Sequence, residues 1–288
     1  MSTAQQQNSR VWFITGASRG FGALISREAL RAGDNVVATA RNSRSVISEI
    51  GEHPSLLALD LDVTDEAQAR QAAAAAVEHF GVIIDVLLNN AGFGLLGGVE
   101  EASAEEVERL YRTNVFGLLA VTRAVLPHMR ARRNGHVLNI SSIGGYRSGA
   151  GFGVYCSTKF AVEGISEALA EELKPLGIHV TVIEPGYFRT DFLDARSLSV
   201  STNLIDDYSA TAGAVREHAK VISHNQPGDP AKLARAVVSL AGNPEAPLRM
   251  PFGSDTVAVI EAKHAFVAAE LERWRSLAVS TDFEAVAR

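Results

Sequence analysis

Hydrophobic and polar positions follow two alternating periods along this chain. Residues 11–15 (V-W-F-I-T) form a short apolar run, and a glycine-rich turn, G-A-S-R-G-F-G, follows at 16–22. Apolar residues then recur at helical spacing from 23 to 32, where Gly33 ends the pattern, and 35–39 (N-V-V-A-T) is a second apolar run. The pattern predicts a strand, a glycine turn, a helix and a second strand.

The same alternation continues to about residue 240. Further strands are predicted at 55–60, 84–88, 136–140 and 178–183, and helices at 65–80, at 103–132, from about 155 onward, and at 230–240. Ser103 and Glu106 form a capping box at the start of the second of these helices. Strands that alternate with helices indicate an α/β fold with a doubly wound parallel sheet. We expect a Rossmann-type three-layer α/β/α single domain spanning 1–288.

Three segments stand outside this alternation. Residues 1–9 are polar and are predicted to be a loose tail. Residues 191–228 are rich in Ser, Thr, Ala and Gly and directly follow a strand, so we expect a substrate lid there. Residues 246–288 are a C-terminal extension with an amphipathic helix from Thr256 to about Leu277, which can shape either the pocket or a subunit contact.

Composition and charge exclude several classes of partner. A chain of 288 residues with 47% hydrophobic content can bury one large core. The net charge of −6 argues against a nucleic-acid or anionic-membrane surface, and no apolar stretch reaches the length of a membrane span. The polar start, M-S-T-A-Q-Q-Q-N-S-R, lacks the apolar segment of a secretory signal, so the sequence predicts a cytoplasmic protein.

Cysteine and histidine usage gives no sign of a disulfide or a metal site. Cys156 is the single cysteine, which excludes an internal disulfide, and we assign it no chemistry. The eight histidines show neither H-x-x-x-H nor H-x-H spacing. We therefore predict that the protein holds no metal.

Several polar motifs fall at the predicted ends of strands. The turn at Gly16, Asn90, Ser142 and Pro185 all come directly after apolar runs. In a doubly wound sheet, ligands bind at the carboxyl ends of the strands. Separate motifs that converge on one edge are hard to explain by core packing, so we expect a binding site at this edge.

Tyr155 and Lys159 stand one helical turn apart, and Ser142 precedes them in N-I-S-S-I-G-G. A free phenol titrates near ~10, and a fixed positive neighbour can lower its pKa by about one to three units. We therefore expect Lys159 to lower the pKa of Tyr155. A serine hydroxyl can hold a substrate oxygen while the tyrosine gives or takes its proton.

Other interpretations of these residues remain open. A buried tyrosine packed on a helix, beside a solvated lysine, has the same Y-x-x-x-K spacing. A nucleotide-sensing regulator with little turnover would keep the same fold, as would a scaffolding subunit that uses its pocket only for stability. Ser142, Tyr155 and Lys159 are all intact, which favours an enzyme over either alternative.

The motifs together resemble the short-chain dehydrogenase/reductase family. T-G-A-S-R-G-F-G, N-N-A-G at 89–92, Asn114, Ser142, Y-x-x-x-K and P-G-Y-F-R-T at 185–190 occur in the family's order between about residues 10 and 195. V-Y-C-S-T-K-F-A and E-P-G-Y-F-R-T-D-F are most similar to the branch of 17-beta-hydroxysteroid dehydrogenases and related carbonyl reductases.

This resemblance implies a nicotinamide cofactor, which we expect to be NADP(H). Ala40 stands where an NAD enzyme of this type usually carries Asp, and Arg41 and Arg19 can meet a 2′-phosphate. In the family, residues matching Asp62 and Val63 flank the adenine, and Thr190 bonds the carboxamide. The full set of residues assigned to the cofactor is Gly16, Ser18, Arg19, Gly20, Phe21, Gly22, Arg41, Asp62, Val63, Asn90, Ala91, Gly92, Tyr155, Lys159, Pro185, Gly186 and Thr190.

The resemblance also implies catalytic roles. Tyr155 is expected to protonate a carbonyl oxygen that Ser142 holds, and Lys159 to bond the nicotinamide ribose. The residue matching Asn114 positions a water that links the lysine to solvent, so we assign proton resupply to Asn114. The predicted activity is NAD(P)H-dependent, reversible reduction of a neutral ketone or aldehyde to an alcohol, by a homodimer or homotetramer.

Aromatic and aliphatic residues on loops at the strand ends predict an apolar substrate pocket. They are Phe93, Leu95, Leu96, Tyr146, Tyr187, Phe188 and Phe192, together with Ser142 and Tyr155. No arginine or lysine is placed obviously to hold a substrate carboxylate, although Arg147 and Arg189 remain candidates. We therefore expect an uncharged, medium to bulky substrate that is aromatic, steroid-like or alicyclic.

Overall fold

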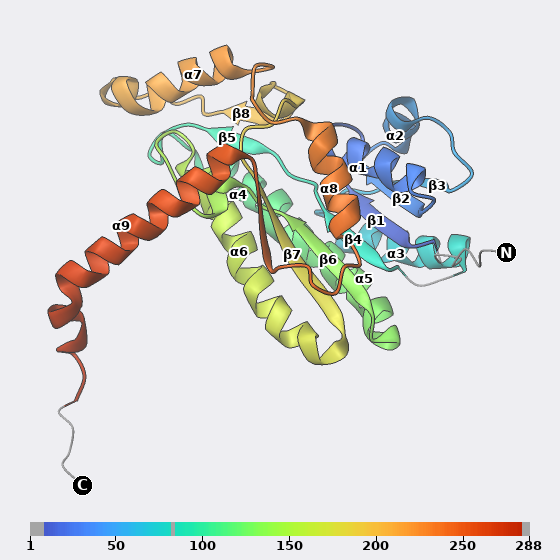
Figure 1. The fold of residues 1–288 in the computed structure, drawn as a ribbon. Helices are drawn as coiled ribbons and strands as arrows, with labels where there is room; N and C mark the ends of the chain where they lie inside the picture. Colours follow the sequence, from blue (N-terminus) through green and yellow to red (C-terminus); the bar gives the residue numbers. More distant parts are fainter. Residues whose placement is uncertain (1–8, 82–83, 284–288) are drawn as a thin grey trace, which may run out of the picture.

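A central sheet of parallel strands organises the molecule (Figure 1). The computed structural model describes residues 9–81 and 84–283, so the tail predicted at 1–9 lies outside the described residues except for Ser9. The strand order is β3-β2-β1-β4-β6-β7-β9. The strands are β1 Val11–Thr15, β2 Asn35–Ala40, β3 Leu56–Asp60, β4 Val86–Asn89, β6 Gly135–Ile140, β7 Ile178–Pro185 and β9 Arg249–Phe252. The order reverses between β1 and β4, where doubly wound folds bind ligands.

Helices cover both faces of this sheet, which confirms the predicted α/β fold (Figure 1). One face carries α1 Gly20–Arg31, α2 Ser43–Ile50 and α8 Pro230–Leu240, and the other carries α3 Glu66–Phe80, α5 Leu118–Arg132 and α6 Gly153–Leu173. Side chains of β1 alternate between the two cores. Trp12 and Ile14 pack with α1 and α8, whereas Val11 and Phe13 pack with α3 and α5. A continuous apolar run is therefore what a strand buried on both faces requires.

Three elements differ from the sequence prediction. Helix α2 was not predicted, and neither was β9, which lies in the extension predicted at 246–288. The single helix predicted at 103–132 is instead α4 Ala104–Tyr111, a π-helix at Arg112–Gly117 and then α5. The capping box of Ser103 and Glu106 is present at the start of α4.

The 191–228 segment is more regular than its composition suggests. It contains β8 Leu198–Val200 and α7 Ala214–Ile222, which lies over the carboxyl ends of the central strands (Figure 1). Strand β8 pairs in parallel with β5 Gly94–Leu96, directly after N-N-A-G. This second, two-stranded sheet ties the segment to the edge where the predicted motifs converge.

The C-terminal extension is dominated by α9, Ser254–Val279, close to the helix expected from Thr256 to about Leu277. Its first turns lie against the body, and the remainder extends away from it (Figure 1). Within the part of the chain that the structure describes, no helix combines the length and the apolar character needed to cross a membrane.

Candidate active site

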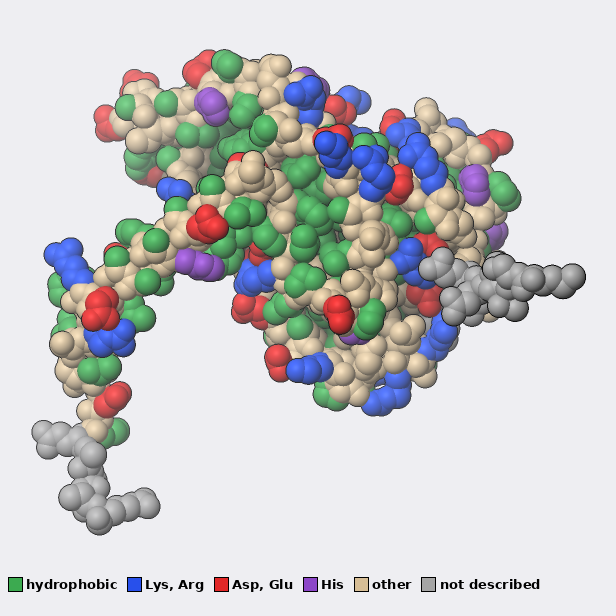
Figure 2. Space-filling model, in the orientation of Figure 1, with side chains coloured by type: hydrophobic (Ala, Val, Ile, Leu, Met, Phe, Trp, Pro, Cys, Tyr) green, Lys and Arg blue, Asp and Glu red, His purple; other side chains and the backbone are tan. Residues whose placement is uncertain are grey.

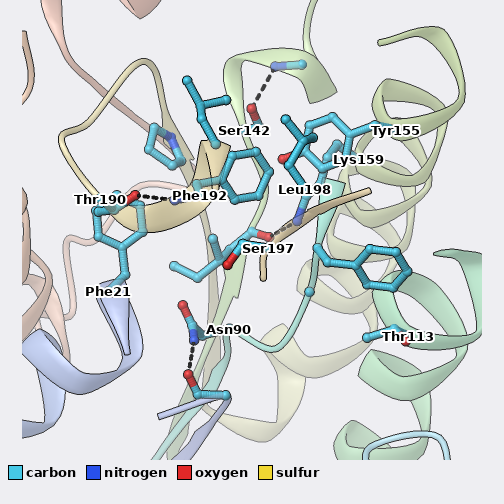
Figure 3. Close-up of a pocket in the computed structure, with 18 of the residues that line it drawn as sticks. Phe21, Asn90, Thr113, Ser142, Tyr155, Lys159, Thr190, Phe192, Ser197 and Leu198 are labelled. Carbon is cyan, nitrogen blue, oxygen red and sulfur yellow. Dashed lines mark hydrogen bonds between the residues drawn. The ribbon is translucent and has the colours of Figure 1, made fainter. Parts of the chain in front are cut away.

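A cavity of about 1050 Å³ lies at the carboxyl ends of the central strands. It brings together motifs from five separate regions of the sequence. Of the residues assigned to the cofactor, all except Gly22 line it, and Ser142, Tyr155 and Lys159 line the same space. Figure 3 shows Ser142, Phe192 and the α6 pair Tyr155 and Lys159 around this space.

The glycine turn packs so closely against N-N-A-G that side chains are excluded from it. Gly16 has φ +67°, and a Cβ there would lie 2.9 Å from the Cα of Ala91. A Cβ on Gly22 would lie 2.5 Å from the carbonyl oxygen of Gly16 and 2.6 Å from Nδ2 of Asn90. Asn90 in turn donates from Nδ2 to the carbonyl oxygens of Thr15 and Gly16, at 2.9 and 3.0 Å. Gly22 therefore does not line the cavity itself, but its lack of a side chain allows Gly16 and Asn90 to pack closely against it.

Tyr155 and Lys159 come from the first turns of α6, and Ser142 comes from the loop after β6. Lys159 Nζ donates to the carbonyl oxygen of Ile140 at 2.9 Å and lies 5.8 Å from the centre of the Tyr155 ring. Ser142 Oγ accepts from the Gly144 amide at 3.0 Å. Tyr155 and Lys159 are only 8% and 7% exposed, so water has little access to either group.

The pKa of Tyr155 moves opposite to the prediction. Burial raises the pKa of its phenol well above the usual value, and a hydrogen bond with Ser142 lowers it only in part. Burial also lowers the pKa of Lys159 to about 8, against the opposing charge of Glu163. The net lowering of the Tyr155 pKa that we expected is therefore not found in this structure, because desolvation of the phenolate dominates.

Asn114 lies in the π-helix, and its side-chain amide holds the backbone of Phe93. Its Nδ2 donates to the Phe93 carbonyl oxygen at 2.9 Å, and its Oδ1 accepts from the Phe93 amide at 3.1 Å. A Cβ on Gly92 would lie 3.1 Å from Oδ1 of Asn114 and 3.9 Å from Nζ of Lys159, so the two side chains are close neighbours. Asn114 does not line the cavity, and its role in proton resupply stays a prediction.

The substrate side of the cavity contains some of the expected residues. Phe93, Tyr187, Phe188 and Phe192 line the cavity, and the rings of Tyr155 and Phe192 lie 5.6 Å apart. Phe188 is also held edge-on against the ring of Phe21 at 5.6 Å, on the side of the glycine turn.

Leu95, Leu96 and Tyr146 do not line the cavity, contrary to expectation. Leu95 and Leu96 are each 2% exposed and belong to two different small cores. Leu95 packs with Leu110 and Cys156, whereas Leu96 packs with Leu198 and Ala219 of the 191–228 segment. Tyr146 instead bonds His264 of α9 through its hydroxyl. Of the two candidate arginines, Arg147 lines the cavity, whereas Arg189 donates to the Gln226 carbonyl oxygen at 3.3 Å.

Several cavity residues escaped the sequence analysis. Arg196, Ser197, Val215 and His218 all belong to the 191–228 segment, and Phe152 precedes α6. None of them belongs to a recognised motif, so no signal in the sequence identified them, and the fold of the 191–228 segment brings the first four to the site. Cys156 also lines the cavity and is 4% exposed.

One cluster of possible metal ligands occurs among the described residues, formed by Asp191, Asp194 and His224. His224 Nε2 lies 3.1 Å from Oδ1 of Asp194, so a hydrogen bond or ion pair accounts for this contact. Asp191 and Asp194 are partly buried and His224 is exposed, and the absence of a metal stays a prediction.

Comparisons with known proteins identify the family of the chain. The sequence profile of the family described as short chain dehydrogenase matches residues 10–200. The oxidoreductase BOA17 of Botryotinia fuckeliana is 37% identical over 95% of this chain and 99% of its own length. A 3-ketodihydrosphingosine reductase of Bacteroides thetaiotaomicron is 38% identical over 85% of this chain and 88% of its own.

A solved structure shows the same fold over nearly the whole chain. This short-chain dehydrogenase from Streptomyces avermitilis is 40% identical, with a TM-score of 0.88 over 96% of this chain and 100% of the other. The family profile, the relatives and the parallel sheet with its cavity lead to one assignment. The chain belongs to the short-chain dehydrogenase/reductase family of oxidoreductases.

Proposed function

We propose that this protein is an NADP(H)-dependent carbonyl reductase that reduces a neutral ketone or aldehyde to an alcohol, reversibly. One observation carries the proposal: Ser142, Tyr155 and Lys159 line the same cavity as the glycine turn. A regulator with little turnover would not need a buried tyrosine and lysine together with a partly buried serine in the cavity that would hold the nucleotide. The placement in the 17-beta-hydroxysteroid dehydrogenase-like branch is part of this proposal.

The residues present fit a dinucleotide. Gly16 and Gly22 keep the turn free of side chains where a pyrophosphate must approach the backbone, and the N-terminus of α1 directs free amides toward it. Asp62 and Val63 line the cavity where the adenine would lie, with Asn90 and Gly92 on its ribose side. Pro185, Gly186 and Thr190 line its opposite end, where Thr190 would hold the carboxamide of the nicotinamide.

The chain supplies the acid–base chemistry of the reduction, and a reduced nicotinamide supplies the hydride when bound. Tyr155 donates its phenolic proton to the substrate oxygen, and its pKa, raised by burial, keeps the phenol protonated until that transfer. Ser142 donates a hydrogen bond to that oxygen, and this bond strengthens as negative charge develops. Lys159 would bond the nicotinamide ribose and stabilise the phenolate left after proton transfer. Asn114 would help to return a proton from solvent.

The end of β2 favours NADPH over NADH. Ala40 leaves this strand end without the carboxylate that would repel a 2′-phosphate, and both Arg19 and Arg41 line the hollow beside it. We expect the wild-type protein to show higher kcat/KM with NADPH than with NADH. Ala40→Asp should reverse this preference by placing a negative charge beside the phosphate. A wild type that prefers NADH, or an aspartate variant with unchanged use of NADPH, would overturn the assignment.

The cavity wall favours an uncharged substrate of medium to large size. Phe93, Phe152 and Phe192 supply apolar surface around Tyr155. The name of the Bacteroides relative is that of a reductase acting on a ketone, 3-ketodihydrosphingosine, which is consistent with a bulky keto substrate. Arg147 also lines the cavity, so the apolar assignment needs a direct test.

A substrate panel can provide that test. Each neutral aryl or alicyclic ketone is paired with a carboxylated analogue of similar size, and kcat/KM is followed by NADPH absorbance. We expect the neutral member of each pair to be the better substrate. Consistently better values for the carboxylates would contradict the apolar-pocket assignment and direct attention to Arg147.

The distal part of α9 supports a homodimer or homotetramer. Val267, Leu271 and Trp274 lie on one stripe of this helix and are 46%, 53% and 54% exposed. Figure 2 shows apolar side chains along the extended part of the helix. A second copy of the chain is the partner we propose for this stripe, since the first turns of α9 already pack against the body.

A further inference from the structure

A second hollow, of about 320 Å³, lies beside the glycine turn at the end of β2. Three guanidinium groups from three parts of the chain border it. Arg19 belongs to the turn and Arg41 follows β2, whereas Arg196 comes from the 191–228 segment. Figure 2 shows basic side chains gathered on this side of the molecule, near α1 and α2.

The positive charges in this hollow are poorly neutralised. Two carboxylates, Glu49 and Asp191, also line the hollow. Among the described residues, none of the three arginines forms a salt bridge with them, and Glu49 is paired with Arg27 instead. Burial lowers the pKa of Arg19, and the charges of Arg196 and Arg41 lower it further, against a smaller opposing effect of Asp191. Like charges held together cost free energy that a bound anion would recover.

Arg19 connects this hollow directly to the 191–228 segment. Its Nη2 donates to the Arg196 carbonyl oxygen at 2.7 Å, and its Nε donates to Ser197 Oγ at 3.1 Å. Ser197 immediately precedes β8, and its own carbonyl oxygen accepts from the Gly94 amide at 2.8 Å. Arg196, which borders the hollow, is therefore separated by only Ser197 from β8, the strand that pairs with β5 beside the cavity.

We propose that Arg196 is a third ligand of the cofactor's 2′-phosphate, and that this phosphate thereby holds residues 191–200 closed over the reaction space. The inference rests on the proposed use of NADP(H). A phosphate monoester is close to a dianion at neutral pH and offers three acceptor oxygens, which match three guanidinium donors. A cofactor without this phosphate would leave Arg196 without its ligand and the segment less firmly held.

Binding of cofactor fragments tests the ligand without requiring turnover. Titration calorimetry would compare adenosine 2′,5′-bisphosphate, adenosine 5′-monophosphate and inorganic phosphate on wild type, Arg196→Ala and Lys220→Ala. Lys220 is the matched control, because it removes a positive charge from the same segment but lies in α7, paired with Glu217 and outside the hollow. We expect Arg196→Ala to reduce the preference for the bisphosphate over the monophosphate on the order of tenfold, and Lys220→Ala to leave it unchanged.

Hydrogen exchange tests the closure. The bisphosphate should slow amide exchange within residues 191–200 in wild type, and should do so much less in Arg196→Ala. Adenosine 5′-monophosphate should give little protection in either protein. Protection that is equal in wild type and Arg196→Ala would overturn the proposed closure.

The outcomes separate this inference from the proposed function. A wild type with no preference for the bisphosphate removes the NADP(H) assignment itself. If wild type prefers the bisphosphate and Arg196→Ala keeps that preference in full, the NADP(H) assignment stands and only the role of Arg196 is overturned. Equal affinity for inorganic phosphate and the bisphosphate would show a general anion site and would also overturn the inference.

Discussion

Tyr155 and Lys159 illustrate what can be predicted for single residues. Helical periodicity placed both side chains on one face, and the motif placed Ser142 near them, which agrees with the cavity they share. The pKa of Tyr155 could not be predicted in the same way. It depends on burial by neighbours such as Phe152 and Phe192, and nothing in the local sequence reports how much water they exclude.

Removal of the phenolic hydroxyl tests the proton donor. Tyr155→Phe keeps the ring and its packing, so circular dichroism and NADPH binding should resemble wild type. Loss of general acid catalysis should lower kcat on the order of 10²–10⁴-fold. Ser142→Ala should lose less, because the proton donor remains. A Tyr155→Phe enzyme that keeps most of its turnover would refute the mechanism.

The pH dependence of the reaction tests Lys159. Its pKa is lowered to about 8, chiefly by burial, so its positive charge is present below that pH and lost above it. Reductive kcat/KM should therefore fall as the pH rises through about 8. We call this fall in kcat/KM the falling limb of the pH profile. Titration of Tyr155 does not cause it, because the raised pKa of Tyr155 keeps the phenol protonated in the same pH range.

Glu163 offers a control for that assignment. Burial raises its pKa to about 7, so it is mostly ionised where Lys159 titrates, and its charge raises the pKa of Lys159. Glu163→Gln should shift the falling limb to lower pH. Profiles measured from pH ~6 to ~10 that superimpose for the two proteins would show that another group causes the limb.

The glycine turn between β1 and α1 shows how well an element can be predicted when backbone chemistry dictates it. Gly16 requires a positive φ, and Gly22 requires a close approach to Gly16 and Asn90. Other elements gave weaker signals. Strand β9 contains Pro251, which argues against a strand in general but is tolerated at the edge of a sheet. The short helix α2 packs Val46 and Ile50 against the core, but eight residues with one fully buried side chain leave only a short periodic pattern in the sequence.

Substitution of one glycine tests the turn. Gly22→Ala would push a methyl group into the Gly16 carbonyl oxygen, which should cost about 1–3 kcal/mol of stability and weaken cofactor binding. Gly164→Ala is the matched control, because a Cβ there meets nothing within 4 Å and α6 is helical around it. Denaturant unfolding should show a loss for the first variant and a gain of about 0.5–1 kcal/mol for the second. Equal stability of the two variants would contradict the packing argument.

At the scale of the whole molecule, the central sheet could be predicted from the sequence, whereas the structure of the 191–228 segment could not. Alternating strands and helices predicted the doubly wound sheet and the edge that carries the site. The 191–228 segment was expected to be a lid, but its pairing of β8 with β5 and its helix α7 depend on contacts with distant residues. The same dependence explains why Arg196 was missed and why Leu95 was wrongly assigned to the pocket.

The assembly state can be tested through α9. Leu271→Asp combined with Trp274→Asp places charge on the exposed apolar stripe and should lower the molar mass measured by light scattering to that of a smaller oligomer or a monomer. Ala269→Asp is the control, because it adds a charge on the other side of the same helix. An unchanged mass for the double variant would show that this stripe makes no subunit contact.

The single cysteine gives the protein a chemical reporter of its own site. Cys156 lies beside Tyr155 in the cavity wall, and burial raises the pKa of its thiol, so alkylation should be slow until the wall opens. Because the chain has no other thiol, the rate of iodoacetamide labelling measures that opening in the unmodified protein. We expect NADPH together with a product alcohol to slow the labelling further, whereas an unchanged rate would mean that the thiol is reached by another route. The native enzyme can therefore be screened for unknown substrates by thiol protection, before any turnover is detected.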